Sequence, residues 1–228
     1  MKKYLAIFMC ALVLLPGCSN MSKTAGGTLI GSGAGAAIGA GLGALIGKDG
    51  KGAAIGAAIG TAVGAGTGAI IGKKMDQKAA ELAAELENAS VETMTDANGL
   101  EAIKVTFGSG ILFPTNGTTL SAASQKELAD FAAQMKDLPD TDITIYGHTD
   151  NTGTAAVNER ISAQRANAVA DFLKGKGISS SRITSEGLSF NSPVADNATA
   201  EGTAQNRRVE IFIYANENMV KAAENGTL

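Results

Sequence analysis

Residues 141–175 read TDITIYGHTDNTGTAAVNERISAQRANAVADFLKG, and two different periods of apolar residues meet within them. Ile143 and Ile145 alternate with polar residues, as in a half-buried strand, whereas residues 155–174 carry apolar side chains at the three- and four-residue spacing of a helix. The short connection at 149–153 is rich in turn-forming residues. A strand that leads directly into a helix predicts a sheet with helices packed on it.

The segments on both sides of this stretch show the same two periods. Apolar residues at every second position predict three more strands, at 103–107, 183–188 and 209–213. A helix is predicted from about Ser121 to Pro139. The resulting order β-α-β-α-β-β predicts an α+β domain with a mixed sheet over residues 100–216. We expect a surface loop with room for a helical turn at 189–206, and a C-terminal tail at 217–228.

The first eighteen residues have the layout of a secretory leader, with a short cationic start, an apolar run from Tyr4 to Leu15 and turn-forming residues before Cys18. The apolar run is too short for a transmembrane helix of the mature protein. The last four residues of the leader, LPGC, resemble the bacterial lipoprotein cleavage box. This implies that residues 1–17 are removed, that Cys18 is acylated, for instance with palmitate, and that residues 18–25 form a tether. The alternative is a plain signal peptide with an incidental cysteine.

A glycine at every fourth residue marks the next segment. The repeat runs through residues 31–47 and, after the charged residues 48–51, through residues 52–72. A helix over 52–72 is roughly 31 Å long, close to the hydrocarbon thickness of a bilayer. Because a stripe without side chains lets two helices pack closely, we predict a helical hairpin over residues 26–72. The segment resembles the glycine zippers of outer-membrane lipoproteins. A flexible low-complexity linker is the alternative, and the sequence leaves insertion into the bilayer open.

Residues 73–99 connect this repeat to the predicted domain. Met75, Ala79, Leu82 and Leu86 recur at helical spacing among Lys and Glu residues. We therefore predict a short amphipathic spacer helix followed by a linker, with the apolar residues forming one face of a tether.

Composition excludes several classes of function. The chain has 19 Lys and Arg against 22 Asp and Glu, a net charge of −3, and these residues are scattered, so nucleic acid is not an expected partner. The two cysteines, Cys10 and Cys18, both lie in the first 20 residues, and His148 is the single histidine. The sequence therefore offers no metal-ligand cluster, and no nucleophile or carboxylate pair placed for catalysis is evident. We expect no metal, no cofactor and no enzymatic activity.

One charged residue interrupts the apolar face of the helix predicted at 155–174. Arg165 lies one turn from both Ile161 and Val169, on the side expected to face the core. A guanidinium there requires an anion or hydrogen-bond acceptors, because desolvating it alone is very unfavourable. Asp150, just before the same helix, is the nearest candidate. The pair is either a semi-buried salt bridge, which is the commoner arrangement, or a receptor for a ligand that carries both charges.

Four stretches together resemble the OmpA-like peptidoglycan-binding domain. They are GHTDNTG at 147–153, NERISAQRA at 158–166, ITSEG at 183–187 and NRRVE at 206–210. The resemblance covers about half of the chain, and the spacing from Asp150 to Arg165 matches the family's motif. One departure is Phe113-Pro114, where the family usually has Phe-Asp. With the leader and the glycine repeat before it, the layout resembles that of YiaD-type outer-membrane lipoproteins.

The resemblance implies a ligand and a role for five residues. The ligand is the diaminopimelate of the peptidoglycan stem peptide, whose free end carries an ammonium and a carboxylate. Asp150 would bind the ammonium and Arg165 the carboxylate, and Asn116, Asn158 and Arg207 would supply further hydrogen bonds.

These interpretations predict a tether that links the outer membrane non-covalently to the cell wall. Acyl chains on Cys18 would hold the membrane, and the C-terminal domain would bind peptidoglycan in the periplasm. Ser19, rather than Asp, follows the cysteine, which under the enterobacterial sorting rule implies the outer membrane. The alternative makes the glycine repeat the working part, as a homo-oligomer or pore in the envelope with the OmpA-like domain as its wall anchor.

Overall fold

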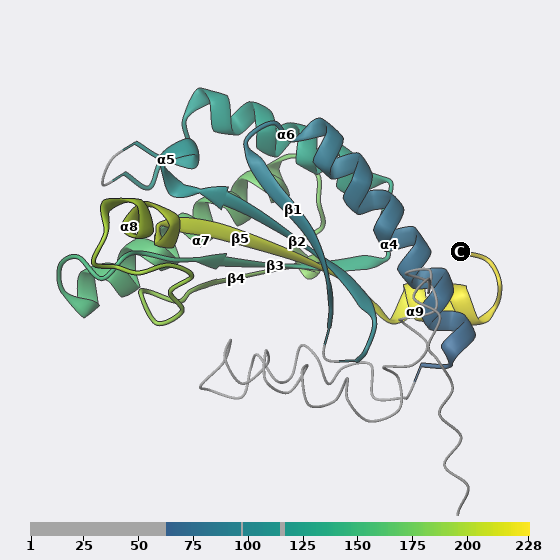
Figure 1. Ribbon diagram of the computed structural model, residues 1–228. Helices are drawn as coiled ribbons and strands as arrows, with labels where there is room; N and C mark the ends of the chain where they lie inside the picture. Colours follow the sequence, from purple (N-terminus) through teal and green to yellow (C-terminus); the bar gives the residue numbers. More distant parts are fainter. Residues whose placement is uncertain (1–62, 97, 115–116) are drawn as a thin grey trace, which may run out of the picture.

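In the part of the chain that the structure describes, residues 63–96, 98–114 and 117–228, five strands form one mixed sheet (Figure 1). In this computed structural model the strand order is β1-β2-β5-β3-β4, with β3 and β4 parallel and the other neighbours antiparallel. The strands are β1 (Ala89–Thr95), β2 (Glu101–Gly108), β3 (Thr141–Gly147), β4 (Ile183–Gly187) and β5 (Arg208–Ala215).

Helices pack against this sheet and extend its core. They are α4 (Ala65–Glu85), α5 (Ser109–Leu112), α6 (Ala122–Lys136), α7 (Ala155–Gly175), α8 (Ala200–Asn206) and α9 (Glu217–Glu224), with a 3-10 turn at Ser180–Arg182. The predicted fold class, an α+β domain with a mixed sheet and packed helices, is confirmed. In the described part of the chain, no helix has the length and apolarity needed to cross a bilayer.

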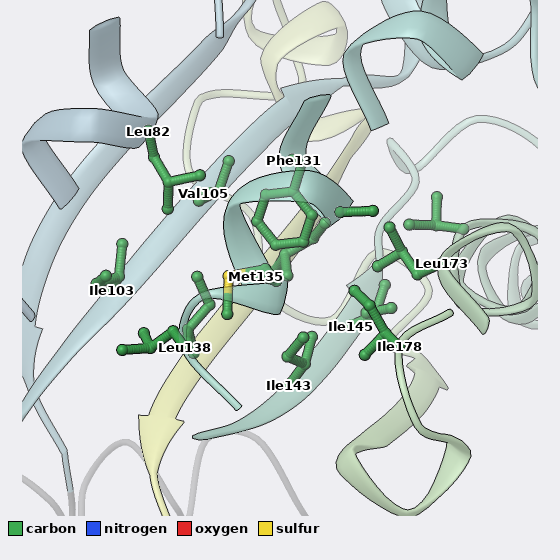
Figure 2. Packing of buried hydrophobic residues seen from close by; sticks show 14 of the residues in the cluster. Leu82, Ile103, Val105, Phe131, Met135, Leu138, Ile143, Ile145, Leu173 and Ile178 are labelled. Atoms are coloured by element: carbon green, nitrogen blue, oxygen red, sulfur yellow. The ribbon is translucent and has the colours of Figure 1, made fainter. Parts of the chain in front are cut away.

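The core brings together apolar side chains from both ends of the described chain. Figure 2 shows Leu82 of α4 near Val105 of β2, with Phe131 and Met135 of α6 above the strands. Ile145 of β3 contributes to the same cluster. Strand alternation explains this arrangement, because every second residue of β2, β3 and β5 points to the face that the helices cover.

The structure confirms the helix predicted in residues 73–99 but contradicts its role as a spacer and the linker predicted after it. Helix α4 continues without interruption across the predicted boundary at residue 72, and Ile71, Met75 and Leu82 on it are fully buried in the domain core. Strand β1, which the prediction omitted, pairs with β2 and lies under the same helix (Figure 1). An apolar helix face is stable only when it is covered, and here the β1-β2 hairpin covers it.

The last glycines of the repeat also belong to this domain. A side chain at Gly68 would meet Leu100, and one at Gly72 would meet Glu101, so these two glycines lie near the start of β2. The leader, Cys18 and residues 26–62 of the predicted hairpin lie outside the described residues.

The predicted C-terminal tail is in fact the helix α9. Asn216 caps it by accepting hydrogen bonds from the backbone N–H groups of Asn218 and Met219. Met219, Val220 and Ala223 are buried in the domain core, and α9 packs beside α4 (Figure 1). Three apolar residues on one face of a short helix thus complete the core at the end of the sheet away from the α7 N-terminus.

The unit β3-α7-β4 places the residues that the sequence singles out. A methyl group at Gly147 would overlap the carbonyl oxygen of Ser162, and one at Gly187 would overlap the backbone of Ala163. The ends of the two parallel strands therefore lie directly against α7, with no room for a side chain between them. This close contact holds the loop after β3 beside the first half of the helix.

Candidate ligand-binding site

Asp150 lies in the loop between β3 and α7. Its carboxylate accepts a hydrogen bond from the backbone N–H of Thr152 (2.9 Å), a local turn that fixes the side chain close to the helix start. Thr154 then caps α7 by accepting from the backbone N–H of Val157. The side chain of Asp150 is 10% exposed, so the carboxylate is largely enclosed but open on one side.

Arg165 projects from the third turn of α7 and is buried. Its Nε donates to the carbonyl oxygen of Gly117 (3.1 Å), and its guanidinium lies over the ring of Phe113, 5.3 Å from the ring centroid. These contacts orient the guanidinium and leave its outer nitrogens free of carboxylate partners among the described residues. Asp150 and Arg165 form no ion pair with each other, so a mutual salt bridge does not explain the place of Arg165 on the helix.

Asp150 is paired instead with Arg207, which follows α8. Nη1 of Arg207 lies 2.6 Å from Oδ2 of Asp150, and the arginine side chain is 42% exposed. The two residues are 57 positions apart, and α8 brings them together. The sequence predicted a role for Arg207 but not this contact.

The charges in this site shift one another's pKa values. Burial raises the pKa of Asp150, but the hydrogen bonds from Arg207 and Thr152 outweigh it, so that the pKa lies below its usual value. Burial and the like charge of Arg207 lower the pKa of Arg165, and the charge of Asp150 opposes them. An arginine remains protonated despite such a shift, so at neutral pH the site holds two cations and one anion.

These three side chains line one cavity of about 730 Å³. Charged and polar groups lie in its wall together with apolar side chains from α7 and from the segment after α5. The lining residues are Ser109, Gly110, Phe113, Pro114, Thr149, Asp150, Thr152, Gly153, Val157, Asn158, Ile161, Arg165 and Arg207. The described residues contain no group of three or more His, Cys, Asp or Glu side chains that could hold a metal ion. The cavity is suited to a small organic ligand with charges of both signs.

Two parts of the chain match models of known protein families. Residues 112–207 match the model of the OmpA family, and this range includes every cavity-lining residue from Phe113 to Arg207 but not Ser109 and Gly110. Residues 112–207 are an OmpA family domain. Residues 1–76 match the model of the YMGG-like Gly-zipper, in agreement with the predicted glycine zipper.

Relatives of the OmpA domain carry envelope and cell-wall names. The chain is 44% identical over 112 residues to the peptidoglycan-binding protein ArfA of Mycobacterium tuberculosis, covering 49% of this chain and 34% of the relative. It is 38% identical over 139 residues to the probable lipoprotein YiaD of Escherichia coli, covering 61% of this chain and 62% of the relative. The chain thus spans between about a third and two thirds of the length of these relatives.

Solved structures show the same fold. The cell wall anchor of the T6SS from Pseudomonas aeruginosa is 30% identical, with a TM-score of 0.52, and the match covers 62% of this chain and 96% of that one. A putative MotB-like protein from Desulfovibrio vulgaris has a TM-score of 0.57 at 24% identity, and the match covers 65% and 95% of the two chains. The second likeness concerns the fold alone.

Of the two predicted asparagine residues of the OmpA domain site, the structure describes Asn158 but not Asn116. Asn158 is buried at the cavity wall, where its Nδ2 donates to the carbonyl oxygen of Thr152 (3.0 Å). It therefore holds the loop that carries Asp150, and its binding role stays a prediction. Asn116 lies outside the described residues.

The departure at Phe113-Pro114 has a structural consequence. The carbonyl oxygen of Pro114 accepts from the backbone N–H of Gly117 (2.8 Å), which closes a turn. A side chain at Gly117 would collide with the ring of Pro114, so this turn requires glycine there. The turn presents the Gly117 carbonyl to Arg165. Sequence reasoning missed Gly117 because a backbone carbonyl leaves no signal in residue type.

Two hydroxyl groups at the cavity wall were also missed. Ser109 and Thr149 are buried, and their side-chain oxygens form no hydrogen bond with any described residue. Hydroxyls are common in any sequence, so only their place beside Asp150 and Arg207 distinguishes them. They add two groups to the wall that can donate or accept.

A network of buried polar side chains lies next to the site of the OmpA domain. Nε2 of His148 lies 3.2 Å from Glu210, and Nε of Arg208 donates to the same carboxylate (2.9 Å). Burial lowers the pKa of His148, so its ring is neutral at neutral pH and Arg208 supplies the positive charge. Arg208 also donates to the carbonyl oxygens of Ser192 and Asn206, which ties the loop before Arg207 to the sheet.

This network makes the stability of the domain depend on pH. Burial raises the pKa of Glu210, but the hydrogen bonds from His148 and Arg208 outweigh it and lower the pKa to about 2. The ionised carboxylate therefore stabilises the folded state above the ordinary pKa of 4.5, and this contribution is lost as the pH falls through about 2. We expect Glu210→Gln to lower the free energy of unfolding at pH 7 by on the order of 3 kcal/mol, with the difference disappearing between about pH 4.5 and 2.

Denaturant unfolding of both proteins across this pH range measures the effect. Glu224→Gln, at the exposed end of α9, is the control and should follow the wild type at every pH. A difference between Glu210→Gln and the wild type that stays constant down to pH 2 would contradict the role of the carboxylate charge.

Proposed function

We propose that this protein binds peptidoglycan non-covalently and anchors the outer membrane to the cell wall. The OmpA domain takes the zwitterionic end of the diaminopimelate side chain, with its ammonium on Asp150 and its carboxylate on Arg165. Cys18 and its acyl chains hold the membrane. The glycine-zipper match over residues 1–76 and the likeness to the probable lipoprotein YiaD support the membrane end, and the likeness to ArfA supports the wall end.

One observation carries the wall end of the proposal. Asp150 and Arg165 line the same cavity without forming an ion pair, and each is oriented by the protein backbone. A buried guanidinium that lines a cavity without a carboxylate partner is unfavourable unless an anion binds there, because it has lost much of its hydration. A guest with a carboxylate and an ammonium satisfies both residues at once.

The rest of the cavity wall suits the same guest. Val157 and Ile161 of α7 line it together with Phe113, so apolar surface lies beside the charged groups. Diaminopimelate has a short methylene chain behind its zwitterionic end, and this chain can bury against these side chains. A free inorganic ion would gain nothing from them. The arrangement therefore favours an organic ligand with an apolar part over a free inorganic ion.

The experiment is a pull-down of the full chain on isolated sacculi with Asp150→Ala and Arg165→Ala. Charge-assisted hydrogen bonds contribute about 1.5–3 kcal/mol each, so either change should weaken binding roughly ten- to a hundred-fold. Asp171→Ala and Arg160→Ala, at exposed positions of α7, are the controls and should bind as the wild type does.

Thermal melts separate binding from folding. Because Arg165 is buried, Arg165→Lys is added as a variant that keeps the charge but loses the forked geometry, and it should bind more weakly at near-native stability. Undiminished wall binding by folded Asp150→Ala and Arg165→Ala would refute the proposal.

A further inference from the structure

The charges of the cavity do not balance. Arg165 and Arg207 contribute two positive charges, Asp150 contributes one negative charge, and no other charged side chain among the described residues lines the cavity. The charged side chains of the site therefore sum to +1. A guest whose bound end carries one ammonium and one carboxylate leaves this excess unchanged, so the proposed ligand end does not complete the site by itself.

Asp150 is also already occupied. Its Oδ2 accepts from Arg207 at 2.6 Å and its Oδ1 accepts from the backbone N–H of Thr152 at 2.9 Å, so each oxygen of the carboxylate already has a donor. An ammonium that approaches Asp150 must therefore compete with a guanidinium of the same charge. Binding of an ammonium at Asp150 is therefore more favourable when Arg207 gives up part or all of this contact, because the two cations repel each other.

The side chains of the two arginines differ in how firmly the protein holds them. Arg165 is buried and is held by the Gly117 carbonyl and the Phe113 ring, whereas Arg207 is 42% exposed and its side chain contacts Asp150. Arg207 is thus the member that can turn toward a guest at the mouth of the cavity. Once it leaves Asp150, its guanidinium needs another anion.

We propose that Arg207 exchanges Asp150 for a second carboxylate of the guest, and so makes the site selective for stem peptides in which this carboxylate is free. This inference rests on the proposed function. Two groups of a stem peptide have the required chemistry: the main-chain carboxylate of the diaminopimelate and the free carboxylate of the preceding glutamate. Amidation or chain extension removes the negative charge of such a group, so the protein would distinguish modified wall from unmodified wall.

The test is a titration of the full chain, in detergent, with four synthetic stem peptides. Each ends in diaminopimelate with an intact zwitterionic side-chain end. One has both other carboxylates free, two have one of them amidated, and the fourth has both amidated. Isothermal titration calorimetry gives the dissociation constant of each peptide for the wild type and for Arg207→Gln, Arg207→Lys and the control Arg160→Gln.

We expect the wild type to bind the peptide with both carboxylates free about tenfold more tightly than the doubly amidated one. The singly amidated peptides identify which carboxylate Arg207 takes. Arg207→Gln should abolish the preference by two opposite changes, because it weakens binding of the free peptide and strengthens binding of the amidated one by leaving Asp150 open. Arg207→Lys should keep part of the preference, and Arg160→Gln all of it.

The other outcomes contradict either the role of Arg207 alone or the proposed function together with it. Equal affinity of the wild type for all four peptides, or a preference that survives in Arg207→Gln, overturns the role of Arg207 and leaves the proposed function standing. Failure of the wild type to bind any of the peptides overturns the proposed function, and the role of Arg207 with it. Thermal melts of the Arg207 variants ensure that a change in affinity is not a loss of fold.

Discussion

Ile71→Ala is expected to lower the free energy of unfolding of the OmpA domain by about 2–5 kcal/mol, the range for removing a buried isoleucine or leucine side chain. Ile71 lies on α4 and is 0% exposed, in one core cluster with Met75 and Leu82. The loss arises because α4 is part of the domain core and the change leaves a cavity between the helix and the sheet. Denaturant unfolding followed by circular dichroism measures it.

The neighbouring residue is a matched control. Ile70 has the same side chain on the same helix but is 42% exposed, so Ile70→Ala should change stability by only about 0.5 kcal/mol. A negligible effect of both substitutions would mean that α4 is only a tether, as the sequence suggested. A confirmed difference has a practical consequence: a fragment of this protein must begin before Ala65 to keep its core.

Gly147→Ala is expected to have the second large effect, because it acts on the fold and on the site together. A methyl group at Gly147 would overlap the backbone carbonyl of Ser162, and a backbone atom cannot turn aside as a side chain can. Overpacking of this kind costs about 3 kcal/mol or more. Relieving it moves α7 away from β3, and with α7 goes Arg165, while Asp150 follows β3. We therefore expect both a lower melting temperature and weaker binding to sacculi.

Gly175→Ala controls for the chemistry of the substitution. Gly175 ends α7, and an added methyl group there would have no neighbour within 4 Å. Its replacement should leave wall binding unchanged and stability the same or up to about 1 kcal/mol higher, because alanine restricts the unfolded chain. A Gly147→Ala protein that melts and binds like the wild type would show that the contact between β3 and α7 is not required.

The site combines residues that are close together in the sequence with residues that are far apart in it. Only the first group can be placed from the sequence. Asp150 and Arg165 belong to one strand-loop-helix unit, so the sequence alone places them near each other. Arg207 reaches Asp150 only through the folding of α8 and β5, and the Gly117 carbonyl reaches Arg165 only through the turn after Phe113. The resemblance to the OmpA family named Arg207, but no local pattern shows which carboxylate it contacts.

The sequence also does not determine whether Asp150 and Arg165 pair with each other. Residue types and spacing leave two interpretations, a salt bridge or a receptor. The structure contradicts the mutual salt bridge, because Asp150 pairs with Arg207 and Arg165 contacts the Gly117 carbonyl and the Phe113 ring, and the receptor interpretation stays a prediction. Ion-pair choice depends on distances of a few ångströms, which spacing along the chain does not determine.

From the sequence alone follow the α+β class, the order of the strands β2 to β5 with helices α6 and α7 between them, and the closeness of Asp150 to Arg165, because these depend on periodicity and on turns within a short stretch. The inclusion of α4, β1 and α9 in the domain is evident only from the folded arrangement. An amphipathic helix or a short strand shows in its own sequence that one face needs covering. What covers it is a surface built by residues far away along the chain.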